Sequence, residues 1–139
     1  MISLKDFLSL TKFNLSFTVS LSLLFGFVLA KNSIDSNLLY PFLAVLLLAL
    51  GVSALNQVQE YKEDGLMTRT KNRPIASKRI SRKMGFFISI CLIFISYVFI
   101  FKTMNILGII IFTAVIIIYN NFYTHAKKQP FMLVFMVQF

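Results

Sequence analysis

Three oxygen-bearing side chains recur at every fourth position in the stretch that follows the second apolar run. Asn56, Glu60 and Asp64 have this spacing, which places them on one face of a helix. Carboxylates side by side repel each other, so a helix gains nothing from such a stripe unless a cation binds to it. Hard oxygen donors with room left for phosphate oxygens suit Mg²⁺. The pattern therefore predicts a metal site with Glu60 and Asp64 as ligands.

Two arginines, Arg69 and Arg73, follow these acids closely in the sequence. Their planar guanidinium groups match the geometry of phosphate oxygens. Acids that hold a metal beside arginines that hold phosphates predict a diphosphate site, in which Asn56 supports the metal or the diphosphate. The alternative is a basic loop that only anchors the membrane topology through surface salt bridges. Spacing alone leaves both interpretations open.

The composition indicates how this site must be positioned. The chain has 139 residues, of which 58% are hydrophobic and only 14% are charged, and its mean hydropathy is +0.79. An ordinary soluble domain has roughly 25% charged residues. The sequence therefore predicts an integral membrane protein. Because the backbone must satisfy its own hydrogen bonds in lipid, the expected fold is an all-α polytopic one.

Four apolar runs are long enough to cross a bilayer as helices. They cover residues 13–30, 38–55, 84–101 and 106–123. A fifth apolar run starts near Phe131 and reaches the last residue, Phe139, before it is long enough to span. The expectation is a single membrane domain over residues 1–139, with four complete spans and a truncated fifth. Either the reading frame is truncated or a second polypeptide completes the fold.

The charge pattern predicts the orientation. The net charge is +9, and eight of the 14 basic residues lie between Lys62 and Lys83. Basic loops stay on the cytoplasmic side, so the N-terminus and the 56–83 loop are expected in the cytoplasm and the spans in the inner or cell membrane. The cluster lies between two apolar runs, which favours the lipid bilayer as its partner and not nucleic acid.

The stretch from Asn56 to Pro74 resembles the first aspartate-rich motif of the UbiA superfamily of intramembrane prenyltransferases. That motif reads N-x-x-x-D-x-x-x-D, followed by R-T-x-x-R-P. Met67 ahead of Arg69, Leu10-Thr11-Lys12 ahead of the first span, and the segment 119–128 (YNNFYTHAKK) are most similar to the protoheme IX farnesyltransferase branch. The resemblance covers nearly the whole chain but only the first half of a family member.

The resemblance implies a helical bundle around a cavity that is open to the membrane. A prenyl (farnesyl) diphosphate would bind through Mg²⁺, and loss of diphosphate would leave an allylic cation that a vinyl group of haem B attacks. By resemblance, Asn56, Glu60 and Asp64 are catalytic. The resemblance also implies that Arg69, Arg73, Lys127 and Tyr123 would bind the diphosphate. Lys127 and Tyr123 fit an interfacial anchor pair equally well.

Three departures from the family pattern keep alternatives open. Glu60 stands where the family mostly has Asp, and Lys62 stands where the haem branch often has another Asp. The second aspartate-rich motif is missing, so the chain could be a split or inactive half that needs a C-terminal partner. The acceptor could also be an aromatic quinone precursor. A small transporter or lipid-binding protein would show no Mg²⁺-dependent binding of farnesyl diphosphate.

Overall fold

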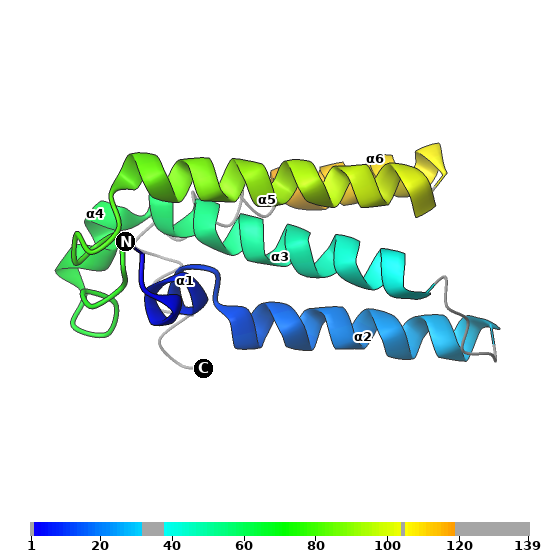
Figure 1. The fold of residues 1–139 in the computed structure, drawn as a ribbon, viewed down its shortest axis with the longest axis horizontal. Helices are drawn as coiled ribbons and strands as arrows, with labels where there is room; N and C mark the ends of the chain where they lie inside the picture. Colours follow the sequence, from blue (N-terminus) through cyan, green and yellow to red (C-terminus); the bar gives the residue numbers. More distant parts are fainter. Residues whose placement is uncertain (1, 32–37, 104, 119–139) are drawn as a thin grey trace, which may run out of the picture. The chain divides into compact units, whose positions relative to one another are not determined.

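The computed structural model describes residues 2–31, 38–103 and 105–118, and every regular element in these ranges is helical. The helices are α1 (Leu4–Leu10), α2 (Phe13–Lys31), α3 (Leu39–Gln59), α4 (Tyr61–Leu66), α5 (Arg82–Thr103) and α6 (Ile106–Ile117) (Figure 1). The chain divides into two units, Met1–Met104 and Asn105–Phe139, and α6 belongs to the second. The predicted all-α class is confirmed for the described residues.

Three of these helices, α2, α3 and α5, are long and apolar enough to cross a membrane. Their spans of 18, 21 and 22 residues correspond to about 27–33 Å of helix, which matches the hydrocarbon core of a bilayer. These helices coincide with the first three predicted spans, and their length and apolar composition are those of an integral membrane protein. Helix α3 extends to Gln59, past the apolar run that ends at Leu55.

The fourth complete span is not confirmed. Helix α6 is strongly apolar, but the described helix has only 12 residues, which is too short to cross a bilayer core by itself. The remainder of the predicted 106–123 span, beyond Ile118, lies outside the described residues. The apolar run from Phe131 lies outside them as well, so the expected fifth helix stays a prediction.

Within the first unit, α3 lies between α2 and α5, and successive spans run in opposite directions (Figure 1). Small residues let α3 and α5 approach closely, as is common where membrane helices meet. A Cβ atom added to Gly51 would lie 2.8 Å from Cγ1 of Ile93 and 3.1 Å from the carbonyl oxygen of Ser89. Farther along the same interface, the Ser96 hydroxyl donates a hydrogen bond of 2.7 Å to the Ala44 carbonyl oxygen. This interface holds α3 firmly.

The short helix α1 packs at the end of the bundle where α3 finishes. Ser3 caps it by accepting a hydrogen bond from the Asp6 amide, and Lys12, in the left-handed region at φ 47°, turns the chain into α2. Leu10 is completely buried in a cluster with Ala54, Val58, Ile75 and Ile80. The N-terminal helix and the segment before α5 therefore lie at the same end of the bundle. Which side of the membrane this end faces stays a prediction.

Candidate functional site

The predicted stripe of oxygen donors lies where α3 gives way to α4. The expected single helix holds as far as Gln59 and is wrong beyond it, because Glu60 leaves the helical conformation at φ −92° and ψ 10°. The four-residue hydrogen-bond pattern nevertheless continues across the break. The Glu60 amide donates to the Asn56 carbonyl oxygen and the Asp64 amide to the Glu60 carbonyl oxygen, both at 2.9 Å. The stripe therefore keeps its alignment although the helix is interrupted.

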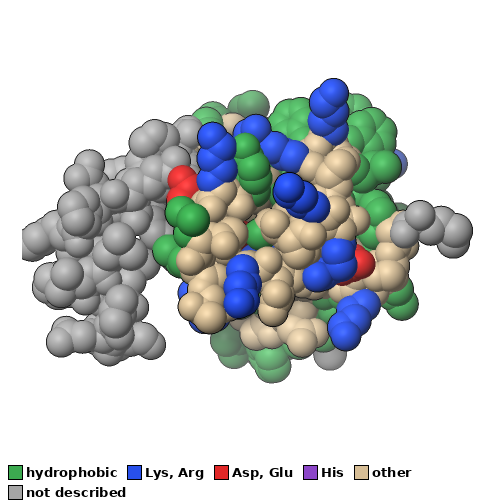
Figure 2. Space-filling view, turned by 90° about the vertical axis from the view of Figure 1, so that its left-hand side faces the viewer, with side chains coloured by type: hydrophobic (Ala, Val, Ile, Leu, Met, Phe, Trp, Pro, Cys, Tyr) green, Lys and Arg blue, Asp and Glu red, His purple; other side chains and the backbone are tan. Residues whose placement is uncertain are grey.

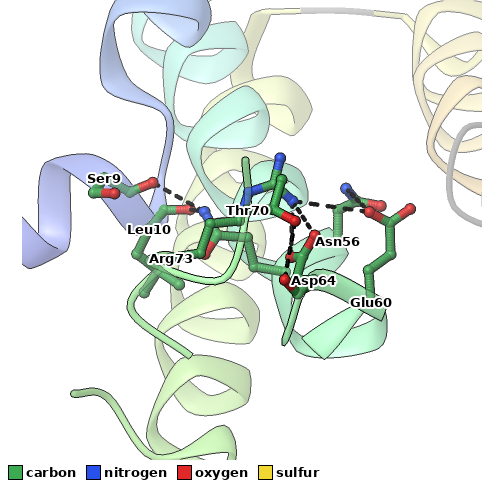
Figure 3. A network of polar contacts seen from close by, with 8 residues as sticks. Ser9, Leu10, Asn56, Glu60, Asp64, Thr70 and Arg73 are labelled. Atoms are coloured by element: carbon green, nitrogen blue, oxygen red, sulfur yellow. Dashed lines mark hydrogen bonds and ion pairs between the residues drawn. The ribbon is translucent and has the colours of Figure 1, made fainter. Parts of the chain in front are cut away.

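Four side chains meet here, namely Asn56, Glu60, Asp64 and Arg73, and we name them the acid–arginine cluster (Figure 3). Asn56, Glu60 and Asp64 are 2%, 4% and 3% exposed. Arg73 Nη1 donates to both oxygens of Asp64, at 2.7 Å and 2.8 Å, and lies 4.0 Å from Oε2 of Glu60. Asn56 Nδ2 donates to the same Glu60 oxygen at 3.3 Å. One guanidinium nitrogen thus serves two buried carboxylates.

The segment between α4 and α5 holds Arg73 in this position. The buried hydroxyl of Thr70 donates to the Asp64 carbonyl oxygen at 3.0 Å, and the Arg73 amide donates to the Thr70 carbonyl oxygen at 2.9 Å. On the other side, the Ser77 hydroxyl and amide both donate to the Arg73 carbonyl oxygen. The main chain of Arg73 is therefore fixed at both sides, whereas its side chain remains 20% exposed.

A second polar contact fixes α1 beside the cluster. Gln57, which is 1% exposed, donates from Nε2 to the carbonyl oxygens of Ser9 and Leu10 at 2.9 Å and 3.1 Å (Figure 3). These carbonyl groups belong to the last turn of α1, where the helix itself supplies no donors. The residue after Asn56 thus joins the end of α3 that carries the acid–arginine cluster to the N-terminal helix.

An ion pair makes a third connection between α1 and the segment before α5. Arg79 Nε donates to Oδ1 of Asp6 at 2.7 Å, and Arg79 Nη2 donates to the Asn72 carbonyl oxygen at 2.8 Å. The hydrogen bond from Arg79, with a smaller contribution from the Ser3 hydroxyl, lowers the pKa of Asp6 below its ordinary 3.8. Asp6 therefore stays ionised at neutral pH and helps to hold α1.

The end face of the first unit around this site is strongly basic. Figure 2 shows lysine and arginine side chains over this face and very few acidic ones. The exposed basic residues of the 62–83 segment are Lys62, Arg69, Lys71, Lys78, Arg79, Arg82 and Lys83. Arg69 makes no hydrogen bond or ion pair with another described residue, so its donors face outward. This basic end face suits a polyanionic ligand.

The cluster fits part of a Mg²⁺ site. Mg²⁺ is usually held by one or two carboxylates together with phosphates and water, and Glu60 and Asp64 supply two. Asn56 Oδ1 is buried without a hydrogen-bond partner among the described residues, which costs about 1–3 kcal/mol unless a ligand or water satisfies it. In the described ranges, no group of three or more His, Cys, Asp or Glu side chains could hold a metal. Phosphate oxygens, water or further ligands would therefore have to complete a Mg²⁺ site at this position.

The structure brings four of the seven predicted site residues together. Arg69 stays apart from the acids, and Tyr123 and Lys127 lie outside the described residues. Sequence reasoning did not single out Gln57 and Thr70, or the Arg82 guanidinium, which lies 4.6 Å from the centre of the Tyr61 ring. Thr70 belongs to the R-T-x-x-R-P stretch, and this motif could have indicated that Thr70 takes part in the site. Gln57 gave none, since it lies off the Asn56 face of α3.

Comparison with known proteins identifies the family. A family model for UbiA prenyltransferases matches residues 19–137, which is most of the chain. The chain belongs to the UbiA prenyltransferase family. The match includes the acid–arginine cluster and the whole basic segment. The membership of this UbiA-family chain, which its motifs predicted, is therefore confirmed.

Several curated relatives are protoheme IX farnesyltransferases. Those of Nitratidesulfovibrio vulgaris (strain DP4) and Flavobacterium johnsoniae are 29% and 32% identical to this chain, over 91% and 96% of its length. That of Bartonella quintana is 33% identical over 89%. The aligned part is 44%, 46% and 40% of these relatives, so the UbiA-family chain spans less than half of their length. No solved structure matches the chain significantly.

Proposed function

We propose that this UbiA-family chain supplies the diphosphate-binding part of a Mg²⁺-dependent intramembrane prenyltransferase. The observation that carries the proposal is the buried acid–arginine cluster at the end of α3. Two carboxylates, an amide oxygen without a partner among the described residues and a guanidinium meet there, beside a basic surface and at the end of a membrane-spanning helix. A purely structural basic loop has no need to bury two acids.

Each residue of the site has a distinct task in this proposal. Glu60 and Asp64 would hold Mg²⁺, and Asn56 Oδ1 would support the metal or a ligand water. When bound, the metal would neutralise charge on the departing diphosphate. Arg69 and Arg73 would bind the diphosphate oxygens and orient the prenyl donor. Lys127 and Tyr123 remain proposed contacts from the segment after α6.

The relatives favour farnesyl diphosphate as the donor and haem B as the acceptor. In the proposed reaction the bond between farnesyl C1 and the diphosphate oxygen breaks, and both electrons leave with the diphosphate. A haem vinyl carbon forms the new carbon–carbon bond, and water adds to the resulting cation and releases a proton. The apolar spans would keep other water away from the allylic cation. The diphosphate-binding end would face the cytoplasm.

We propose that a second segment completes the site, whether in the same polypeptide or in a separate one. Two carboxylates alone leave most Mg²⁺ coordination positions to phosphate and water. The relatives are more than twice as long as the aligned part. Their additional length is the natural source of further acidic ligands and of the rest of the cavity.

Two measurements test the proposal. The first is binding of radiolabelled farnesyl diphosphate, with Mg²⁺ or with a chelator, to the chain reassembled in lipid nanodiscs with the remaining part of the Flavobacterium johnsoniae relative. The second is pigment analysis in a bacterial host that lacks haem farnesylation and quinone prenylation, in which the chain is co-expressed with the remaining part of the Flavobacterium johnsoniae relative. We expect Mg²⁺-dependent binding and farnesylated haem. A prenylated quinone would instead identify an aromatic acceptor, and the absence of any Mg²⁺-dependent binding would contradict the proposal.

A further inference from the structure

We infer that Arg73 is an internal counter-cation for the metal-binding acids, and that it transfers from Asp64 to the incoming diphosphate when the metal binds. This inference rests on the proposed function. It predicts that the site takes metal poorly by itself and takes metal and diphosphate together. The chain's own arginine would thus make binding of the two ligands cooperative.

The contacts of Arg73 carry the first step. Its Nη1 atom lies 2.7 Å and 2.8 Å from the two oxygens of Asp64, so it occupies the chelating position between them. The same nitrogen is 4.0 Å from Oε2 of Glu60. A divalent cation that used these carboxylates would compete for the same oxygens. It would also be repelled by a positive charge at contact distance from both.

The burial of the acids explains why an internal cation is present. Asp64 and Glu60 are 3% and 4% exposed, so water screens them poorly. Buried carboxylates near each other are strongly unfavourable unless a cation and hydrogen bonds compensate them. Arg73 provides both, and it keeps the two acids in place for a metal. Asn56 Oδ1, buried without a partner among the described residues, is a hydrogen-bond acceptor and potential metal ligand that Arg73 does not satisfy.

The way in which Arg73 is held makes a transfer possible. Its main chain is fixed by Thr70 and Ser77, whereas its side chain is 20% exposed at the basic end face. The hydrogen bonds that the Arg73 side chain makes to described residues all come from Nη1. Nε and Nη2 are therefore available to bind a phosphate before Nη1 leaves Asp64. A guanidinium binds phosphate with two parallel hydrogen bonds. These bonds favour rotation of the Arg73 side chain away from Asp64. The metal thus displaces the Arg73 guanidinium from Asp64, and the diphosphate becomes its new partner.

The decisive experiment compares metal binding with and without Arg73. Mn²⁺ and Mg²⁺ affinities are measured by electron paramagnetic resonance and calorimetry on the nanodisc-embedded chain, without any diphosphate. We expect Arg73→Gln to tighten binding of the metal alone about tenfold, the factor for one lost charge-assisted contact. We expect the same variant to weaken Mg²⁺-dependent binding of inorganic pyrophosphate by a similar factor. Arg73→Lys, which keeps a charge without the planar fork, should fall between.

Arg69→Gln is the matched control, because Arg69 is an exposed arginine of the same segment without contact to the acids. It should leave the affinity for metal alone unchanged. An unchanged or weaker metal affinity in a folded Arg73→Gln chain overturns the inference. So does a gain of the same size in Arg69→Gln, which would point to general charge on the end face.

Arginine labelling in the unsubstituted chain provides a test that does not depend on the folding of variants. Phenylglyoxal modification, mapped by mass spectrometry, should become faster at Arg73 when Mg²⁺ is added and slower again when pyrophosphate follows, while Arg69 does not respond to Mg²⁺ alone. If saturating Mg²⁺ does not change the rate at which Arg73 is modified, the proposed transfer of Arg73 is wrong. If metal alone binds as predicted but no diphosphate ever binds, the proposed function fails whereas the competition of Arg73 with metal stands.

Discussion

Arg73 Nη1 donates to both carboxylate oxygens of Asp64, across nine residues of chain. This contact joins the acidic half of the N-x-x-x-E-x-x-x-D motif to the basic half that follows it. The chain can close on itself here because α4 is only six residues long and the Thr70 hydroxyl bonds back to the Asp64 carbonyl oxygen. The two halves of the motif therefore form one site and not two neighbouring ones.

Asp64→Asn should abolish Mg²⁺-dependent binding of farnesyl diphosphate while the protein still inserts and folds. The substitution keeps the shape of the side chain but removes the charge that Arg73 and a metal both need. We expect a loss of about a hundredfold or more, because removing one partner of a buried, hydrogen-bonded charge pair costs about 2–5 kcal/mol of binding free energy. Binding of labelled farnesyl diphosphate in nanodiscs and helix content by circular dichroism measure the two effects.

Glu63→Gln is the control for this substitution, since it removes the same charge one residue away and outside the acid–arginine cluster. It should change binding only slightly. Farnesyl diphosphate binding that survives Asp64→Asn at the normal strength would remove Asp64 from the site. Equal losses in both variants would indicate an effect of net charge alone.

Gly51→Ala should loosen the packing of α3 on α5. An added Cβ would lie 2.8 Å from Cγ1 of Ile93 and 3.1 Å from the main-chain nitrogen of Ile93 and the carbonyl oxygen of Ser89. Main-chain atoms cannot move aside without shifting the helix, so we expect a loss of about 1–3 kcal/mol in the free energy of unfolding. Thermal unfolding in detergent, followed by circular dichroism, measures it.

Gly26→Ala provides the comparison, because an added Cβ at Gly26 meets nothing within 4 Å. Alanine is the better helix former by about 0.5–1 kcal/mol, so this variant should be as stable as the parent or slightly more stable. If the two alanine variants unfold at the same temperature, the α3–α5 contact does not depend on Gly51.

The positions of the membrane spans could be predicted from sequence because length and apolar composition decide them. The runs 13–30, 38–55 and 84–101 all became helices, and each extends at most a few residues beyond its prediction. The shared face of Asn56, Glu60 and Asp64 was predicted by their four-residue spacing, but the burial of these side chains was not. The break at Glu60 was not predicted either, because spacing along a chain carries no information about where the next segment folds back.

Tertiary contacts explain what spacing could not predict. The pairing of Arg73 with Asp64 instead of with an external phosphate depends on the turns between Met67 and Ile80, which no periodicity indicates. The role of Gln57 depends on α1 lying beside α3, and that contact joins residues 48 positions apart. The sequence predicted that Asn56, Glu60 and Asp64 share one face, and it assigned Arg73 to a phosphate without indicating its contact with Asp64.

The Asp6–Arg79 ion pair should make the docking of α1 depend on pH in the acid range. The hydrogen bond from Arg79 lowers the pKa of Asp6 below 3.8, its value without the partner. For an acid whose pKa is lowered by folding, the stabilisation is fully present above 3.8 and is lost as the pH falls through the folded-state pKa. The protection factors of the α1 amides, which are exchange rates corrected for their intrinsic pH dependence, should therefore be constant near neutral pH and should fall only at strongly acidic pH.

Carboxyl ¹³C NMR of Asp6 measures this pKa directly. Arg79→Gln should return it toward 3.8, and high salt should raise it in the parent chain because the pair is partly exposed. Arg69→Gln, at an exposed arginine without contact to Asp6, should leave it unchanged. An Asp6 pKa that does not respond to Arg79→Gln would show that the ion pair is absent in the membrane.

Gln57→Glu should detach α1 from the end of α3. Glutamate has the same size but cannot donate the hydrogen bonds that Nε2 gives to the Ser9 and Leu10 carbonyl oxygens. It would instead place a negative charge against two acceptors in a position that is 1% exposed. We expect the free energy of docking to fall by about 3 kcal/mol, since a buried charge without donors costs at least as much as a lost hydrogen bond. Hydrogen exchange over residues 4–12 measures the change.

Gln59→Glu tests the same chemical change two residues farther on, where the side chain is exposed at the end of α3. Water can solvate the new charge there, so exchange over residues 4–12 should match that of the parent chain. Because Gln57 follows Asn56 directly, release of α1 should also weaken Mg²⁺-dependent binding of farnesyl diphosphate. Unchanged α1 protection in Gln57→Glu would mean that Leu10 and its apolar neighbours hold the helix without the amide.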